Sequence, residues 1–199
     1  SIEYEEKPVC PEKNEVLRAF NVCSYKDVKI VMLGQDPYQQ KGIATGLLFG
    51  NHIETPEKAF SPSLIVLRDS LRISKFFTES KVFNPTLENW ASQGILLLNS
   101  SLTVEMNRVG SHSILWRNLL SSLLKKLSTY NPGIIYVLFG KQAQFFKTCI
   151  NHNCNTILVE NHPAWYAREG LNMPPTIFHQ IHSLVEKQYG YSINWFQEY

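Results

Sequence analysis

The stretch that most constrains the fold is residues 28–50, which begins with an apolar run and continues into a motif-bearing loop. Apolar side chains fill most of the first six positions, as expected for a central parallel strand covered on both faces. Gly34 ends the run, because glycine permits a turn that other residues resist. Pro37 then restricts its own φ and pushes Asp36 toward extended geometry. We therefore expect three side chains held stiffly at the carboxyl end of this strand, where open α/β folds bind ligands: Gln35, Asp36 and Tyr38.

The size and charge of the chain set broad limits. The length of 199 residues predicts a single domain, residues 1–199, with a substantial core and a loose N-terminal arm over residues 1–10. The net charge of +2 is small, whereas many nucleic-acid-binding domains are far more basic. Any contact with nucleic acid should therefore be local and modest.

The cysteines predict neither a disulfide framework nor a metal centre. Four cysteines show no recognisable pairing pattern, which favours a reduced, intracellular setting such as the cytoplasm. Cys149, His152 and Cys154 superficially suggest a metal site, but their spacing fits no standard zinc pattern and a fourth ligand is missing. We expect no metal and no cofactor. No apolar run approaches the roughly 20 residues that a membrane helix needs, and no secretory signal is present.

The rest of the chain alternates strands with helices. Further buried strands are predicted over residues 95–98, 134–139 and 156–159. Helices are predicted over residues 11–20, 62–73, 87–91, 111–127 and 177–188, with another from residue 140 to about residue 149. Leu17 should help form the apolar face of the first helix, and Leu119 that of the 111–127 helix. The alternation predicts an α/β fold with a central, mainly parallel four-stranded sheet flanked by helices.

Chemistry-bearing residues follow each predicted strand. The first strand leads to Asp36 and its neighbours, the second to Asn99, the third to Gly140 and Lys141, and the fourth to His162. The carboxyl ends of parallel strands lie at one edge of a sheet. Residues far apart in the sequence are therefore expected to line one pocket.

These segments together resemble the family 1 uracil-DNA glycosylases, which remove uracil from DNA. The resemblance covers about residues 27–197 and follows the order of the chain. The segments that carry it are Gly34–Tyr38 (water activation), Phe49 (pocket aromatic), Ser61-Pro62-Ser63 (phosphate loop), residues 94–99 (uracil recognition), Gly140-Lys141 (second phosphate loop), His162-Pro163 (DNA intercalation) and residues 193–195.

The resemblance implies a reaction and roles for individual residues. The enzyme would hydrolyse the N-glycosidic bond of deoxyuridine in DNA, leaving an abasic site for base excision repair. Asp36 would activate water, and a neutral His162 would stabilise the uracil anion. Four residues would form the uracil pocket: Gln35, Tyr38, Phe49 and Asn99. The target base would be extruded from the stack, and the DNA contacts would come from Ser61, Pro62, Ser63, Gly140, Lys141, Trp165 and Tyr166.

Four segments depart from the family pattern, and one of them is the segment before Trp90, which lacks the family's usual His-Gly. Gln39 stands where the family has His, Lys141 replaces the usual Ser, and Ala164-Trp165-Tyr166 replaces Ser-Pro-Leu in the intercalating loop. Tyr166 thereby occupies the position of the inserted Leu, where a phenol could wedge or stack. These departures bear more on DNA affinity than on the reaction.

Each residue also has a plainer interpretation when taken alone. Asp36 could be a turn carboxylate, Asn99 a turn cap, Phe49 a core aromatic and His162 a structural histidine. The segment 61–63 could simply begin a helix. A catalytically weak uracil-DNA-binding protein of the same fold and an enzyme for a small-molecule substrate are the alternative functions. As partners we expect uracil-containing DNA and, by resemblance alone, an acidic DNA-mimic inhibitor, with the protein a monomer.

Overall fold

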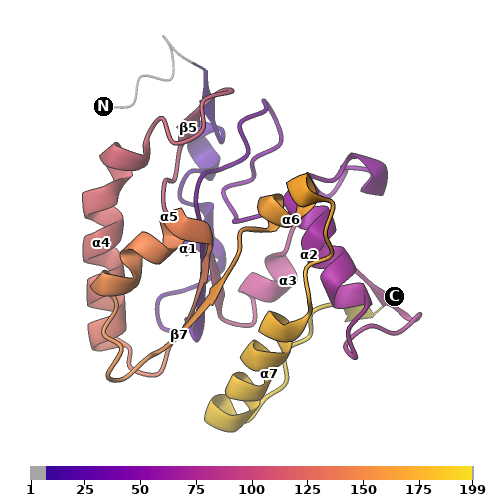
Figure 1. Ribbon diagram of the computed structural model, residues 1–199. Helices are drawn as coiled ribbons and strands as arrows, with labels where there is room; N and C mark the ends of the chain where they lie inside the picture. Colours follow the sequence, from indigo (N-terminus) through magenta and orange to yellow (C-terminus); the bar gives the residue numbers. More distant parts are fainter. Residues whose placement is uncertain (1–7, 199) are drawn as a thin grey trace.

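A four-stranded parallel sheet forms the centre of the molecule (Figure 1). The computed structural model describes residues 8–198. The strands are β2 (Ile30–Gly34), β4 (Ile95–Asn99), β6 (Ile135–Phe139) and β7 (Thr156–Glu160), in the spatial order β4-β2-β6-β7. All neighbouring pairs are parallel, so the four carboxyl ends lie at one edge. The predicted α/β fold is confirmed.

Three of the four strands, including the edge strand β4, are buried along their whole length. Every residue of β2, β4 and β6 is buried, which explains why these segments read as continuous apolar runs. The edge strand β7 is only partly buried. The register of β2 and β4 places Gly34 directly opposite Asn99. This pairing brings the first two predicted site segments together.

Helices cover both faces of the sheet. Figure 1 shows α4 and α5 on one side and α2, α3, α6 and α7 on the other. The helices are α1 (Arg18–Val22), α2 (Pro62–Arg72), α3 (Glu88–Ala91), α4 (Ser113–Tyr130), α5 (Gly140–Gln144), α6 (Pro163–Glu169) and α7 (Thr176–Tyr189). Short 3-10 helices are η1 (Lys13–Glu15), η2 (Glu57–Ala59) and η3 (Phe145–Cys149). A single large apolar cluster joins the sheet to these helices.

Two small antiparallel pairs were not expected. Strand β1 (Val9–Cys10) pairs with β5 (Val104–Glu105), and β3 (Lys81–Val82) pairs with β8 (Gln197–Glu198). The prediction of a loose arm over residues 1–10 is therefore wrong for Val9 and Cys10, and Cys10 is buried. Residues 1–7 of that arm lie outside the described range. Two-residue strands have no periodicity that a sequence could reveal.

Three predicted helices differ from the structure in their details. The helix expected from residue 140 to about residue 149 is divided into α5 and the 3-10 helix η3. The expected helix over residues 11–20 is divided into η1 and α1, and Leu17 between them is exposed. In α4, Leu119 is also exposed rather than on the buried face, whereas Leu120, Leu124 and Leu127 pack inward. Leu119 and Leu120 are consecutive, and adjacent helical residues point about 100° apart, so both cannot face the core.

Helix α6 occupies the segment that the sequence predicted as an intercalating loop. It begins at Pro163 and is followed by Gly170 with a φ of 64°. Proline at the first helical position and glycine just after the last are ordinary helix boundary signals. Both signals are present in the sequence, so the helix could have been predicted. Because the segment is helical, side chains two residues apart between residues 163 and 169 point to nearly opposite sides of the helix.

Candidate active site

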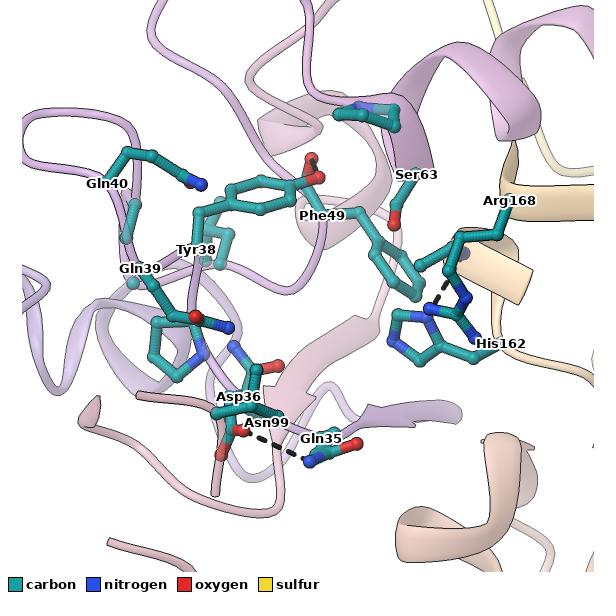
Figure 2. A pocket seen from close by; sticks show the side chains of 17 residues that line it. Gln35, Asp36, Tyr38, Gln39, Gln40, Phe49, Ser63, Asn99, His162 and Arg168 are labelled. Atoms are coloured by element: carbon teal, nitrogen blue, oxygen red, sulfur yellow. Dashed lines mark hydrogen bonds between the residues drawn. The ribbon is translucent and has the colours of Figure 1, made fainter. Parts of the chain in front are cut away.

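A cavity of about 310 Å³ opens at the carboxyl edge of the sheet. Six residues predicted as catalytic or as part of the base pocket line it: Gln35, Asp36, Tyr38, Phe49, Asn99 and His162. Figure 2 shows His162 and Arg168 on one side and Tyr38, Gln39 and Gln40 on the other. The volume of the cavity lies at the lower end of the range found for small-molecule sites. The structure thus brings together residues from three strand ends.

Asp36 is held through one of its two oxygens. Its Oδ2 accepts a 2.8 Å hydrogen bond from the backbone N–H of Gly110 and a 3.1 Å bond from Nε2 of Gln35. Its Oδ1 is buried and has no hydrogen-bond partner among the described residues. Burial raises the pKa of the Asp36 carboxyl, and the two hydrogen bonds and the nearby His112 only partly offset this effect. The carboxylate is therefore oriented and retains a free acceptor.

His162 presents a defined face to the cavity because it also caps α6. Its Nδ1 accepts a 3.2 Å hydrogen bond from the backbone N–H of Ala164, two residues into the helix. The proton of a neutral imidazole must then be on Nε2. Burial lowers the pKa of His162 to about 4, and the charge of Arg168 adds to this effect. At neutral pH the side chain is an uncharged N–H donor.

Two glycines at strand ends allow neighbouring side chains to approach the backbone closely. A Cβ on Gly34 would lie 2.2 Å from Cδ1 of Leu48 and 3.4 Å from Oδ1 of Asn99. Gly140 follows β6, which lies between β2 and β7, and a Cβ there would lie 2.9 Å from Cβ of His162. Its φ of 78° also favours glycine. Gly140 thus lets His162 approach closely at the end of β6.

Asn99 contributes a second buried acceptor without a partner. It is 5% exposed, and its Oδ1 has no hydrogen-bond partner within the described part of the chain. Buried side-chain polar atoms in native proteins are nearly always satisfied, so such atoms at a cavity point to a ligand. Asp36 and Asn99 therefore indicate a ligand that offers hydrogen-bond donors.

The aromatic residues of the cavity are fixed by contacts with one another. Phe49 has a φ of 64° and packs edge-to-face against both Phe139 and His162, with ring centroids 5.4 Å apart in each pair. The Tyr38 hydroxyl donates a 3.0 Å hydrogen bond to the backbone carbonyl of Phe49. A left-handed φ is rare for a phenylalanine and is found mainly where surrounding structure imposes it. The resulting aromatic walls suit a planar ligand.

The predicted DNA-contact residues are divided between two locations. Pro62 and Ser63 line the cavity, at the N-terminus of α2. Ser61 is the N-cap residue, but its hydroxyl accepts a hydrogen bond from Asn51 instead of capping the helix. Gly140, Lys141, Trp165 and Tyr166 are not among the cavity-lining residues.

Tyr166 in particular does not lie where a projecting wedge was expected. It is 7% exposed, and its hydroxyl donates a 2.8 Å hydrogen bond to Glu160. The cause is the geometry of α6. Ala164 and Arg168 are four residues apart and both line the cavity, so Tyr166, midway between them, points to the opposite side of the helix. Trp165 is partly buried against the core and packs edge-to-face against Tyr166.

Sequence reasoning missed two residues of the candidate site. Gly110 binds Asp36 through its backbone across 74 residues, and no local pattern signals such a contact. Arg168 lines the cavity and is exposed. Its spacing of four residues from Ala164, combined with the helix signals of Pro163 and Gly170, could have placed it there.

The cysteines, the possible metal ligands and the helices outside the cavity do not indicate a second functional site among the described residues. All four cysteines are free thiols. Within residues 8–198, no group of three or more His, Cys, Asp or Glu side chains could hold a metal ion. No helix in the described part of the chain is long and apolar enough to cross a membrane.

Comparison with known proteins identifies the family. Residues 20–183 match the family model described as the uracil DNA glycosylase superfamily. A uracil-DNA glycosylase of Mesomycoplasma hyopneumoniae is 34% identical over 194 residues, covering 97% of this chain and 86% of the relative. A uracil-DNA glycosylase of Campylobacter jejuni is 36% identical over 165 residues, covering 81% of this chain and 68% of the relative.

Solved structures share the fold. The crystal structure of mimivirus uracil-DNA glycosylase has a TM-score of 0.83 at 21% identity and covers 95% of this chain and 75% of that one. Its identity is low, so this likeness speaks to the fold alone. Together with the matching family model and relatives, it places the identified cavity within a known scaffold. The chain belongs to the uracil-DNA glycosylase superfamily, a family of DNA-repair enzymes.

Proposed function

We propose that this protein hydrolyses the N-glycosidic bond of deoxyuridine in DNA and releases free uracil. The observation that carries the proposal is the convergence of Asp36, Asn99 and His162 on one cavity, with two buried acceptors lacking partners among the described residues. The names of the relatives at 34% and 36% identity point to the same substrate.

Asp36 would act on the sugar side of the bond. When the bond from C1′ to N1 breaks, its electron pair leaves with the base, and the sugar develops positive charge. An ionised Asp36 stabilises that charge, and its free Oδ1 accepts the proton of the water that bonds to C1′. The hydrogen bonds from Gly110 and Gln35 to Oδ2 keep the carboxylate oriented for this role.

His162 would act on the leaving base. The departing uracil carries the electron pair as an anion, with charge on its O2. A neutral imidazole that donates from Nε2 stabilises this charge without a proton transfer. The bond from Ala164 N–H to Nδ1 supports this tautomer, and the lowered pKa of His162, about 4, supports the neutral form.

The remaining pocket residues would select uracil. Asn99 can accept from N3–H and donate to O4, whereas cytosine presents the opposite pattern and would leave buried groups unpaired. Phe49 would stack on the base. Tyr38, held by its bond to the carbonyl of Phe49, would exclude the methyl group of thymine. Gln35 would contribute its backbone N–H to a base oxygen.

DNA would bind across the mouth of the cavity with the target nucleotide extruded. Pro62 and Ser63 at the cavity are the best-placed phosphate contacts, and Ser61, Gly140, Lys141 and Trp165 are further candidates. We do not assign insertion to Tyr166, because insertion would break its hydrogen bond to Glu160. An acidic DNA-mimic inhibitor would compete for the same surface. A mimivirus UNG variant has been solved in complex with UGI.

The test is a base-release assay on oligonucleotides that differ at one position. Matched strands carrying uracil, thymine or cytosine are incubated with the protein, and free base and abasic sites are quantified. We expect release of uracil alone. Binding of uracil-containing DNA without release would instead favour a non-catalytic DNA-binding protein. Hydrolysis of a free nucleoside that uracil-containing DNA fails to inhibit would favour a small-molecule enzyme.

A further inference from the structure

Arg168 is a cation at the cavity that the family motifs do not account for. It lies near the end of α6, is exposed and lines the same cavity as Asp36 and His162. It makes no ion pair with any residue of the described range 8–198. Figure 2 shows its side chain on the His162 side of the cavity. An arginine without an anionic partner beside an open cavity is suited to an anionic ligand.

The residue that shares the cavity side of α6 with Arg168 has no polar side chain. Ala164 and Arg168 are four residues apart on α6, and both line the cavity. Ala164 has no hydroxyl, and its backbone N–H is already used by Nδ1 of His162. The alanine therefore offers no side-chain hydrogen bond to DNA. The guanidinium one turn later on the same face offers up to five donors.

The surrounding charges leave Arg168 available. The carboxylate of Glu160, at the end of β7, accepts hydrogen bonds from the Tyr166 hydroxyl and the Asn161 backbone and forms no ion pair with Arg168 among the described residues. Glu169 is adjacent in sequence but forms no ion pair with Arg168 among the described residues. The charge of Arg168 reaches into the site, because it contributes to the lowered pKa of His162.

We propose that Arg168 is a positioning residue that binds a backbone phosphate next to the extruded deoxyuridine. It binds the phosphate from the helix face that Ala164 shares, where it is the residue with a side-chain donor, and it orients the strand over the cavity. The proposal rests on the function proposed above, because it assumes a DNA substrate. Arginine suits this task better than lysine, because its planar fork can bind two phosphate oxygens at once.

The test measures binding separately from catalysis. All proteins carry Asp36→Asn, which suppresses cleavage, and binding of a deoxyuridine-containing duplex is followed by fluorescence anisotropy at several salt concentrations. Arg168→Ala should weaken binding about tenfold, as expected for loss of one charge-assisted hydrogen bond. It should also reduce the slope of log K against log salt by about 0.9, the value for one phosphate contact. Arg168→Lys should restore the slope but only part of the affinity.

Lys187→Ala is the matched control, because it removes one positive charge from an exposed position in the last turn of α7, outside the cavity. It should change neither the affinity nor the slope by a comparable amount. Equal effects of Lys187→Ala and Arg168→Ala would show a general charge effect and overturn the proposal. An unchanged slope in Arg168→Ala would overturn it as well.

A neutral methylphosphonate placed on either side of the deoxyuridine identifies the phosphate. With one of these linkages, the Arg168 parent should lose about tenfold in affinity, whereas Arg168→Ala should lose almost nothing further. Strictly additive losses with both linkages would exclude a direct contact. If the protein with Asp36 intact released no uracil, the proposed function would fail, whereas the binding results would still decide whether Arg168 contacts phosphate.

Discussion

The Asp36 side and the His162 side of the cavity are held in different ways. Asp36 is oriented by a backbone N–H from Gly110, 74 residues away in the sequence. His162 is oriented by Ala164, two residues further along its own helix. One anchor is therefore a product of tertiary folding, and the other forms as soon as α6 does. Changes around Gly110 should disturb the side that we propose activates water, whereas changes in α6 should disturb the side that we propose faces the leaving base.

Burial also acts in opposite directions on the two residues. It raises the pKa of Asp36, and it lowers the pKa of His162 to about 4. In each case the neutral form gains, because both groups lose solvent. The proposed reaction needs Asp36 charged and His162 neutral, so desolvation works against the first requirement and supports the second. The hydrogen bonds to Asp36 from Gly110 and Gln35 partly compensate.

The largest expected effect is that of Asp36→Asn. It should lower the single-turnover rate of uracil release by about 10²- to 10⁴-fold, since the amide can neither stabilise positive charge on the sugar nor accept the water proton. The amide oxygen can still accept from Gly110, so folding should be preserved. The measurement is the rate on a uracil-containing oligonucleotide, with DNA affinity as the control. A rate within threefold of the parent would remove Asp36 from the mechanism.

His162→Asn should have the next largest effect. Asparagine is a favourable helix N-cap, so α6 should persist while the donor to the base is lost. We expect a fall of about 10²- to 10³-fold in the rate, comparable to loss of one oxyanion-hole donor. Thermal unfolding serves as the control and should be nearly unchanged. A large drop in stability with a normal rate per folded molecule would assign His162 a purely structural role.

Gly140→Ala tests the close approach that brings His162 to the cavity. The new methyl group would lie 2.9 Å from Cβ of His162, and the backbone φ is 78°. We expect a ten- to hundredfold slower reaction, because small displacements of catalytic groups are costly. Gly190→Ala has a similar φ of 72° with nothing within 4 Å, so it reports strain alone. If both variants retained parental rates, the steric role of Gly140 would be refuted.

The smallest effect expected is in the acid limb of the pH–rate profile. As pH falls, Asp36 gains a proton at a pKa above its ordinary 3.8, and His162 gains one near 4. Both protonations remove the active form, so the parent rate should fall with a slope approaching two protons. His162→Asn should leave a slope of about one. Parallel limbs in the two proteins would show that His162 does not titrate in the reaction.

Much of the candidate active site followed from the sequence, since it depends on local rules. An apolar run followed by Gly34 predicts a strand that stops, and parallel strands place their carboxyl ends together. Asp36, Asn99 and His162 could therefore be assigned to one pocket, and all three line it. The order β4-β2-β6-β7 and the pairs β1–β5 and β3–β8 were not predicted. Strand order depends on how helices cross the sheet, which hydrophobic patterning does not specify.

The intercalating segment shows where resemblance outweighed a local signal. Pro163 and Gly170 mark a helix, yet the motif favoured a loop with Tyr166 projecting. In the helix, Tyr166 binds Glu160, and Arg168 lines the cavity instead.

By itself the sequence determined the buried strands, the residues that follow them and thus the chemistry available at the sheet edge. Only the tertiary structure decided which oxygen of Asp36 is held, which nitrogen of His162 bears the proton, and that Arg168 lines the cavity. The physical reason is range. Strand and turn preferences are properties of neighbouring residues, whereas burial, a hydrogen bond across 74 residues and the closeness of two side chains exist only after the chain has folded.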